Sequence, residues 1–427
     1  MRRAAAALAV VALVAATGCG GSGGGSGSGA KGSPARGGSA APRAPSDEDR
    51  LTALLRRRAA ALQAESPSRY AATSTGPQRA RDRLAAADAR GLPLRAVRLT
   101  ATTTDVHGAR ATLQVRSGYA VQGIPGRFES ARTLHARRTG AGWRIVSETS
   151  RRQRHPWELA PFGATRSAHF LVFAPRAIDT TGLTDALEAG YARMRDILAR
   201  GRLQRRYLVV VAGDDAQARQ MTSGIRGVAT LAAISDTSVS EQGAAEQVAR
   251  VSSQRLLVVW PAFQPLDADG RRRVVAHELT HASLAHVTSG RTPSWLVEGV
   301  ALYVSGDRRV DVAAQLVTDG TLSAGARRAL TLTALSTPDA IARLGGEGQD
   351  AAYAYSSSAA FYIVARYGQK RFFDLYDAFN RESLTGKPGP DLVDLALRRT
   401  LHVGLLQLER NLRRWIVTRA VVSPLSP

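Results

Sequence analysis

Two histidines and a glutamate lie close together in residues 276–282, which read AHELTHA. If this stretch is helical, His277 and His281 lie about 40° apart around the helix axis and one turn apart along it. Both imidazoles can then reach one ion, and zinc binds imidazole nitrogen readily. Glu278 points about 100° away from His277, so it can accept a proton from a zinc-bound water without ligating the ion. The stretch therefore predicts a zinc site with Glu278 as base.

A catalytic zinc ion also needs a third protein ligand and an open position for water. His286 follows the pair closely, but on a continuous helix it faces about 180° away from His277, so we expect it at the helix C-terminus. Glu298 lies in PSWLVEGVA, residues 293–301, where a second helix would surround it with apolar side chains. A buried carboxylate is costly unless it meets a cation. We expect Glu298 to be the third ligand; the alternative is that it pairs with an arginine.

HELTH followed by PSWLVEGVA resembles the gluzincin zinc metallopeptidases, and specifically the peptidase MA-like family. Relatives of aminopeptidase N in that group carry the similar phrase W-L-x-E-G-x-A after their HExxH helix. The resemblance covers roughly residues 165–380. It implies peptide-bond hydrolysis with zinc held by His277, His281 and Glu298, and with Glu278 as the catalytic base. The sequence has no equivalent of the Gly-rich motif that recognises a free N-terminus, so aminopeptidase activity is not implied.

The same resemblance implies a tyrosine whose hydroxyl stabilises the oxyanion formed when water attacks the carbonyl. In gluzincins this tyrosine lies at a helix start, and a small residue follows three positions later. Tyr355, with Ser358 after it, matches this pattern, and Tyr353 is the alternative. Gluzincins also bind the substrate backbone along an edge strand beside the zinc helix. Residues 227–235 and 255–260 are the available strands, and the sequence leaves open which one is the edge.

The elements around these residues predict an α+β fold for residues 156–427. Short apolar runs predict strands at 169–174, 207–211 and 255–260. Between the first two of these strands, apolar residues at helical spacing predict a helix at 184–199. Asp267 or Asp269 can cap a helix over residues 271–286, and Ser294 can cap the next one. Mostly helical patterns follow at 359–367, 371–380, 392–399 and 405–417. Strands first and helices afterwards indicate a mixed or antiparallel sheet followed by a helical core that contains the HExxH helix.

Residues 46–155 predict a smaller α+β unit. Helical spacing favours helices over 47–63 and 78–89, and four strand-like stretches follow at 94–104, 109–119, 127–137 and 142–148. This order resembles the cystatin-like roll of the nuclear-transport-factor-like superfamily. His107 and His135 lie here without a carboxylate or cysteine cluster, so we interpret them as ordinary histidines. The resemblance implies a spacer or interaction module rather than an enzyme.

The first 45 residues predict export. Arg2 and Arg3 precede an apolar run at 4–16 that is too short to span a bilayer comfortably, and the only cysteine, Cys19, follows it. This arrangement resembles a bacterial lipoprotein signal over residues 1–19, in which the cysteine is lipidated after cleavage; the alternative is an ordinary secretory signal. Residues 20–45 predict a disordered tether. We expect an exported protein anchored through lipid on Cys19 to the outer face of the cytoplasmic membrane.

Composition limits the expected partners. The 427-residue chain has a formal net charge of +23, almost entirely from arginine, because only three lysines occur. The arginines are scattered and not interleaved with aromatic residues, so we expect no specific nucleic-acid partner; an anionic cell-wall polymer stays open. The expected partners are a peptide or protein substrate and the membrane. A competing interpretation is a zinc-binding cell-surface scaffold or binding lipoprotein with little or no peptidase activity, but a structural zinc site has no need of a base such as Glu278.

Overall fold

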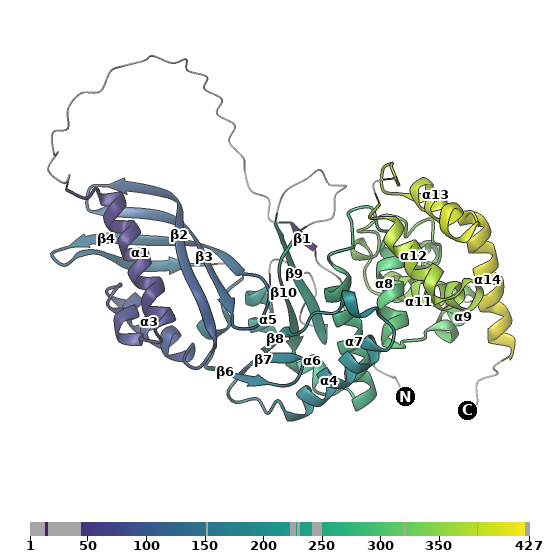
Figure 1. Ribbon diagram of the computed structural model, residues 1–427, viewed down its shortest axis with the longest axis horizontal. Helices are drawn as coiled ribbons and strands as arrows, with labels where there is room; N and C mark the ends of the chain where they lie inside the picture. The colour runs from purple at the N-terminus through teal and green to yellow at the C-terminus, as the bar shows by residue number, and fades with distance from the viewer. Residues whose placement is uncertain are drawn as a thin grey trace, which may run out of the picture.

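The computed structural model describes residues 13–15, 44–150, 153–222, 228, 231–240, 250–318, 322–381 and 383–422. It forms an α+β fold with two sheets and a helical C-terminal half (Figure 1). Cys19 and nearly all of residues 20–45 lie outside the described residues, so lipidation and the tether stay predictions. No described helix is both long enough and apolar enough to cross a membrane.

The smaller sheet belongs to residues 46–155, which we call the N-terminal unit. Its strands pair in chain order as an antiparallel meander: β2 (Leu94–His107), β3 (Arg110–Val121), β4 (Phe128–Thr139) and β5 (Gly142–Thr149). Three helices accompany it: α1 (Asp47–Gln63), α2 (Pro67–Ala71) and α3 (Pro77–Asp88). Ser46 and Asp49 form a capping box at the start of α1, and Leu51, Leu54 and Leu55 of α1 pack on this sheet. The helix and strand order predicted for this unit is confirmed.

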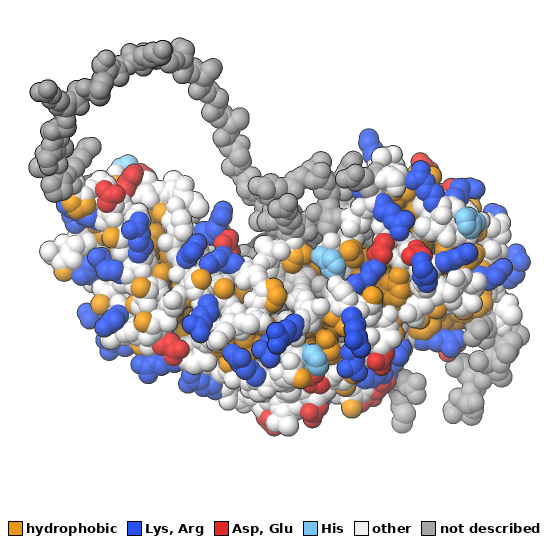
Figure 2. Space-filling view, in the orientation of Figure 1, with side chains coloured by type: hydrophobic (Ala, Val, Ile, Leu, Met, Phe, Trp, Pro, Cys, Tyr) orange, Lys and Arg blue, Asp and Glu red, His pale blue; other side chains and the backbone are white. Residues whose placement is uncertain are grey.

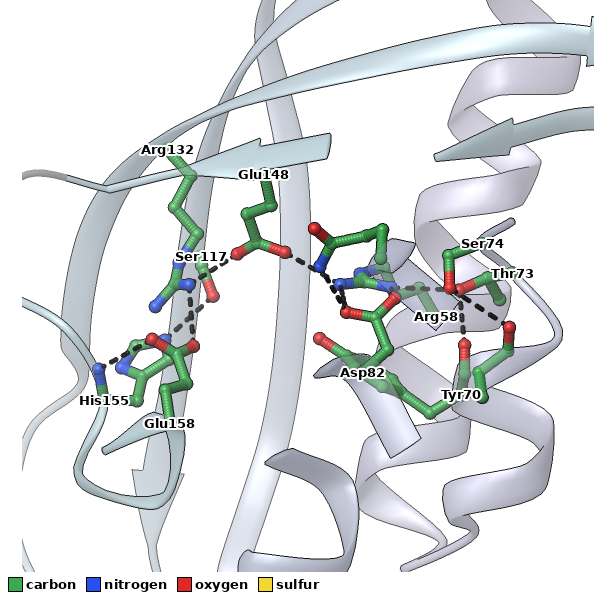
Figure 3. A network of polar contacts seen from close by, with 12 residues as sticks. Arg58, Tyr70, Thr73, Ser74, Asp82, Ser117, Arg132, Glu148, His155 and Glu158 are labelled. Atoms are coloured by element: carbon green, nitrogen blue, oxygen red, sulfur yellow. Dashed lines mark hydrogen bonds and ion pairs between the residues drawn. The ribbon is translucent and has the colours of Figure 1, made fainter. Parts of the chain in front are cut away.

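Buried ion pairs fill the space between the helices and the sheet of the N-terminal unit (Figure 3). Arg58 is fully buried and donates to the two carboxylate oxygens of Asp82 at 2.5 and 2.8 Å and to Glu148 at 2.7 Å. Arg132 bridges Glu148 and Glu158 at 2.5 and 2.6 Å. Glu158 belongs to the chain that follows, so this network joins the N-terminal unit to residues 156–427, which we call the C-terminal unit.

The larger sheet is mixed, with the strand order β1-β9-β10-β8-β7-β6. Its strands are β1 (Leu13–Ala15), β6 (Phe162–Arg166), β7 (Phe170–Pro175), β8 (Tyr207–Ala212), β9 (Ala233–Ser240) and β10 (Arg250–Val259). β7, β8 and β10 are parallel neighbours, while β6 and β9 run antiparallel to β7 and β10. β1 pairs in parallel with the outer edge of β9. The sequence offered two stretches as the strand that binds the substrate backbone. The one that overlaps β9 is thus farther from the centre of the sheet than the one in β10.

Both faces of the larger sheet are covered, and Figure 1 shows this sheet between the N-terminal unit and the C-terminal helices. On one face Leu208 and Leu257 share a hydrophobic core with Tyr119 and Phe128 of the N-terminal unit. On the opposite face the alternate strand residues, such as Val209, pack against helices. The two units therefore share one of the hydrophobic cores of the protein.

The C-terminal unit contains eleven α-helices within its described residues: α4 (Thr181–Arg195), α5 (Asp215–Met221), α6 (Trp260–Phe263), α7 (Ala268–Leu284), α8 (Ser294–Ser305), α9 (Val310–Thr318), α10 (Ala324–Ala329), α11 (Glu347–Tyr367), α12 (Gln369–Ala378), α13 (Pro390–Leu401) and α14 (Leu405–Val422). α7 packs between α4 and α8, and α8 packs against α11. Arginine side chains are spread over both units on the face shown in Figure 2, as expected from the sequence.

Candidate metal centre

Helix α7 carries the HExxH residues into the interior. Asp267 caps it, because its Oδ1 accepts the N–H of Gly270 at 2.7 Å. From Val274 onward every α7 residue is buried. Gly190 of α4 allows this close packing, since a Cβ atom there would lie 2.5 Å from Cγ1 of Val275. The glycine thus positions the turn of α7 that immediately precedes His277.

Helix α8 brings Glu298 to the same place. It begins at Ser294 after Pro293, and the Ser294 hydroxyl donates to Leu335 O at 3.1 Å, so the predicted capping role of Ser294 is wrong. Glu298 is 5% exposed. A Cβ atom at its neighbour Gly299 would lie 3.0 Å from Ser356 O of α11. Gly299 therefore allows two helices to approach closely beside the carboxylate.

The three expected metal ligands meet. The Nε2 atoms of His277 and His281 lie 3.0 Å apart, and Glu298 Oε2 lies 3.3 and 3.5 Å from them. Four ligands at the zinc–nitrogen and zinc–oxygen distances of a tetrahedral site lie about 3.3 Å from one another. The three protein atoms therefore have the spacing that three corners of such a tetrahedron require. Within the described residues no fourth histidine, cysteine, aspartate or glutamate joins this group.

The surroundings of this group favour a cation. His277, His281 and Glu298 are 0%, 6% and 5% exposed. Glu298 Oε2 and Glu278 Oε1 are buried without a hydrogen-bond partner among the described residues. An uncompensated carboxylate in such a place is costly, so a divalent cation would stabilise the site. Two imidazoles and one carboxylate are the donor set of many catalytic zinc sites.

The charges in the group act on one another. Burial by itself raises the pKa of Glu298, but the two histidines outweigh it and lower the pKa to about 2. Burial lowers the pKa of His277. For His281 the carboxylate of Glu298 overcomes burial and raises the pKa. Glu298 therefore carries its negative charge at neutral pH, as a metal ligand must.

Glu278 lies beside the group but is held by a different partner. Its Oε2 accepts the backbone N–H of Ser235, in β9, at 2.7 Å. Its Oε1 lies 3.9 Å from Nε2 of His277. Burial, with a smaller contribution from Glu298, raises the pKa of Glu278 to about 8 despite the opposing effect of His281. A carboxylate with this pKa can both accept and release a proton near neutral pH.

The two tyrosines lie on opposite sides of α11, because residues two apart differ by about 200° around a helix. Burial raises the pKa of Tyr353, and the next largest contributions come from Glu298 and Glu278 of the metal group. Burial also raises the pKa of Tyr355, but there the neighbouring charges are Glu409 and Arg413 of α14. Tyr353 therefore lies on the side of α11 that feels the charges of Glu298 and Glu278, and Tyr355 lies on the side that faces α14.

These surroundings favour Tyr353, which the sequence ranked second, over Tyr355. The family pattern places the tyrosine at a helix start, but α11 begins at Glu347, so neither residue starts it. The two tyrosines differ in which side of α11 they occupy relative to Glu298, since α11 packs against α8. The spacing to a small residue does not distinguish them.

No protein-family model and no curated protein matches this chain.

His107, His135 and His286 lie outside the metal group, as expected. His286 is exposed just beyond the end of α7. His107 contacts exposed Asp105, and His135 hydrogen-bonds to Thr112 at 3.1 Å. The residue that sequence reasoning missed is Ser235, because it contributes only a backbone N–H and its side-chain type carries no signal.

Proposed function

We propose that this protein is a zinc-dependent peptide hydrolase of the gluzincin type, related to the peptidase MA-like family. The observation that carries the proposal is the arrangement of His277, His281 and Glu298 at the mutual spacing of zinc ligands, with a fourth side chain, Glu278, beside them. The three-ligand set supports a catalytic rather than a structural site, because structural zinc sites are usually closed by four protein ligands.

A bound zinc ion would supply Lewis acidity that polarises the scissile carbonyl and lowers the pKa of water. Glu278 accepts the proton of the attacking water and passes it to the leaving amine. The N–H of Ser235 keeps the carboxylate of Glu278 oriented toward the histidines. The hydroxyl of Tyr353 donates a hydrogen bond to the developing oxyanion, a role supported by the effect of Glu298 on Tyr353 and by a raised pKa that keeps the hydroxyl protonated.

The substrate backbone would bind along the outer edge of β9. β9 carries Ser235 next to Glu278, so a peptide paired with this edge passes beside the base. Pairing of β1 with residues 237–239 supports this, because it shows that an extended segment fits there. Recognition through main-chain hydrogen bonds makes binding tolerant of substrate sequence.

The finer assignments of fold and location belong to the same proposal. The antiparallel meander with helices on one side supports a cystatin-like N-terminal unit, and the HExxH helix packed on β9 and α8 supports a zincin core. An exported protein held at the membrane by lipid on Cys19 is proposed from the sequence alone.

Digestion of a peptide library and of a denatured protein by the full chain tests the proposal. We expect cleavage products with zinc present and none after chelation, with activity restored by added zinc. Bound zinc without any cleavage would support the competing scaffold function, and cleavage that survives chelation would contradict the proposed metal dependence.

A further inference from the structure

The N-terminal unit contacts the strand pair that carries Ser235. Gly126, between β3 and β4, forms an antiparallel bridge with Ser253 of β10. The N–H of Arg127 donates to Ser252 O at 3.0 Å. Gly126 has a φ of +91°, and a Cβ atom there would lie 2.3 Å from Ser252 O, so only glycine fits. The turn between β3 and β4 therefore rests directly on the backbone of β10.

A buried ion pair links β10 to β9 near this contact. Arg255 of β10 donates to Asp236 of β9 at 2.8 Å and to Met221 O at 2.6 Å. The two side chains are 9% and 13% exposed. Arg255 and Asp236 are also paired in the register of the two strands, so this ion pair holds the strands in register. Asp236 directly follows Ser235, whose N–H holds Glu278.

Tyr119 of the N-terminal unit lies beside this ion pair. Tyr119, His155, Asp236 and Arg255 are among the residues that line a cavity of about 20 Å³ between the two units, which is room for one water. Burial raises the pKa of Tyr119 to about 12 against the opposing effect of the Arg255 guanidinium. The Tyr119 hydroxyl therefore stays protonated beside Asp236 and Arg255.

The residue on the other side of Ser235 packs in the core that the N-terminal unit shares with the larger sheet. Ile234 is fully buried, and it belongs to the same hydrophobic core as Tyr119 and Phe128. Ser235 thus lies between Ile234, packed in the core shared with the N-terminal unit, and Asp236. The ion-pair partner of Asp236, Arg255, lines the same cavity as Tyr119 of that unit. The backbone N–H of Ser235 has little freedom to move while these contacts persist.

We propose that the N-terminal unit is a working part of the catalytic centre: through Gly126, Tyr119 and the Arg255–Asp236 pair it holds β9 in the position that presents Ser235 N–H to Glu278. These are positioning residues, since none of them touches the metal group. This role of the N-terminal unit deepens the proposed function. Only the expected effect on turnover rests on the proposed function. It assigns the N-terminal unit a role that neither a spacer nor a recruitment module would have.

The test compares the full-length variants Gly126→Ala and Gly91→Ala. Both glycines have a positive φ, +91° and +79°, but a Cβ atom at Gly91 meets nothing within 4 Å. The control therefore bears a similar backbone strain without the clash at β10. We expect Gly126→Ala to speed amide exchange in residues 233–240 at least about tenfold and to lower kcat roughly 10- to 100-fold. Zinc content should stay unchanged in both variants, and the control should behave as wild type.

Unchanged exchange of residues 233–240 in Gly126→Ala overturns the inference, whether or not the protein hydrolyses peptides. Faster exchange in a protein that shows no hydrolysis at all supports the positioning role and contradicts the proposed function, so the two failures are distinguishable. If Gly126→Ala does not fold, Arg255→Met and Arg255→Lys replace it. We expect Arg255→Met to lower kcat with KM and zinc content retained, and the lysine to restore part of kcat; equal kcat in Arg255→Met and wild type overturns the inference.

Discussion

The Nε2 atoms of His277 and His281 lie 3.0 Å apart inside the protein, on one face of α7. Two neutral imidazoles in this arrangement can share at most one proton, whereas a metal ion satisfies both nitrogens at once. Glu298 reaches the same point from α8, so residues 17 or more positions apart in the chain converge on one position.

His281→Ala should abolish metal binding, because it removes one of only three ligands in the group. The wild type should contain one zinc per chain and should lose thermal stability on chelation, since a ligand at about 1,000 times its Kd stabilises by about 4 kcal/mol. Metal analysis and thermal unfolding with and without chelator measure both effects. His286→Ala is the matched control, because His286 is exposed just beyond α7. Full zinc content in His281→Ala would contradict the ligand assignment.

Tyr353→Phe should slow hydrolysis roughly 100- to 1,000-fold with zinc retained, because it removes a donor to the oxyanion. Tyr355→Phe should leave the rate near that of wild type, since the charges nearest Tyr355 are Glu409 and Arg413 of α14. The two variants are compared by measuring their single-turnover rates of hydrolysis and their metal content. The opposite ranking would restore the order predicted from the sequence.

Gly190→Ala should destabilise the protein. The added Cβ atom would lie 2.5 Å from Val275 Cγ1 and 3.1 Å from Ala276 N, and the latter belongs to the backbone of α7. Overpacking of this kind costs about 1–3 kcal/mol, or occasionally more, against about 1 kcal/mol gained from replacing a helical glycine. Denaturant unfolding measures the net loss. Gly345→Ala is the control, because it meets nothing within 4 Å; a Gly190→Ala variant at least as stable as this control would contradict the close packing of α4 on α7.

Glu148→Gln should lower the free energy of unfolding at pH 7 by about 3 kcal/mol, because Arg58 and Arg132 lose their shared carboxylate. Burial opposes ionisation of Glu148, but the two arginines prevail and lower its pKa from 4.5 to about 2. The folded-state pKa thus lies below the unfolded value, so this stabilisation is present above pH 4.5 and is lost as the pH falls toward 2.

Urea unfolding at pH 7 and at pH 3 checks this. The difference between wild type and Glu148→Gln should shrink at the lower pH. The control Glu129→Gln changes a carboxylate whose side chain is 42% exposed, so its effect should stay within about 0.5 kcal/mol. An equal difference at both pH values would show that the stabilisation does not come from the charge of Glu148.

Much of the metal centre could be predicted from the sequence because helical geometry relates residues that are close in the chain. The spacing of His277 and His281 determines their common face, and the apolar residues around Glu298 indicate that its carboxylate is buried. The choice between Tyr353 and Tyr355 depends instead on how α11 packs against α8, which no local spacing encodes.

The shared core of the two units was harder to predict. Residues 207–211 are apolar without alternation, a pattern typical of a strand buried on both faces, but it does not say what covers each face. Arg58, Arg132, Glu148 and Glu158 have the residue types of an exposed surface, and only the tertiary structure brings them together inside.

The central claim is that Glu278 is the base of a metal-dependent hydrolysis. Glu278→Gln keeps the size of the side chain and the contact with Ser235 N–H but removes the group that accepts the proton. Zinc content and peptide-library cleavage of wild type and Glu278→Gln test this most directly. We expect one zinc per chain in both proteins and a rate at least about 1,000-fold lower in the variant; unchanged cleavage by Glu278→Gln with zinc bound would contradict the account.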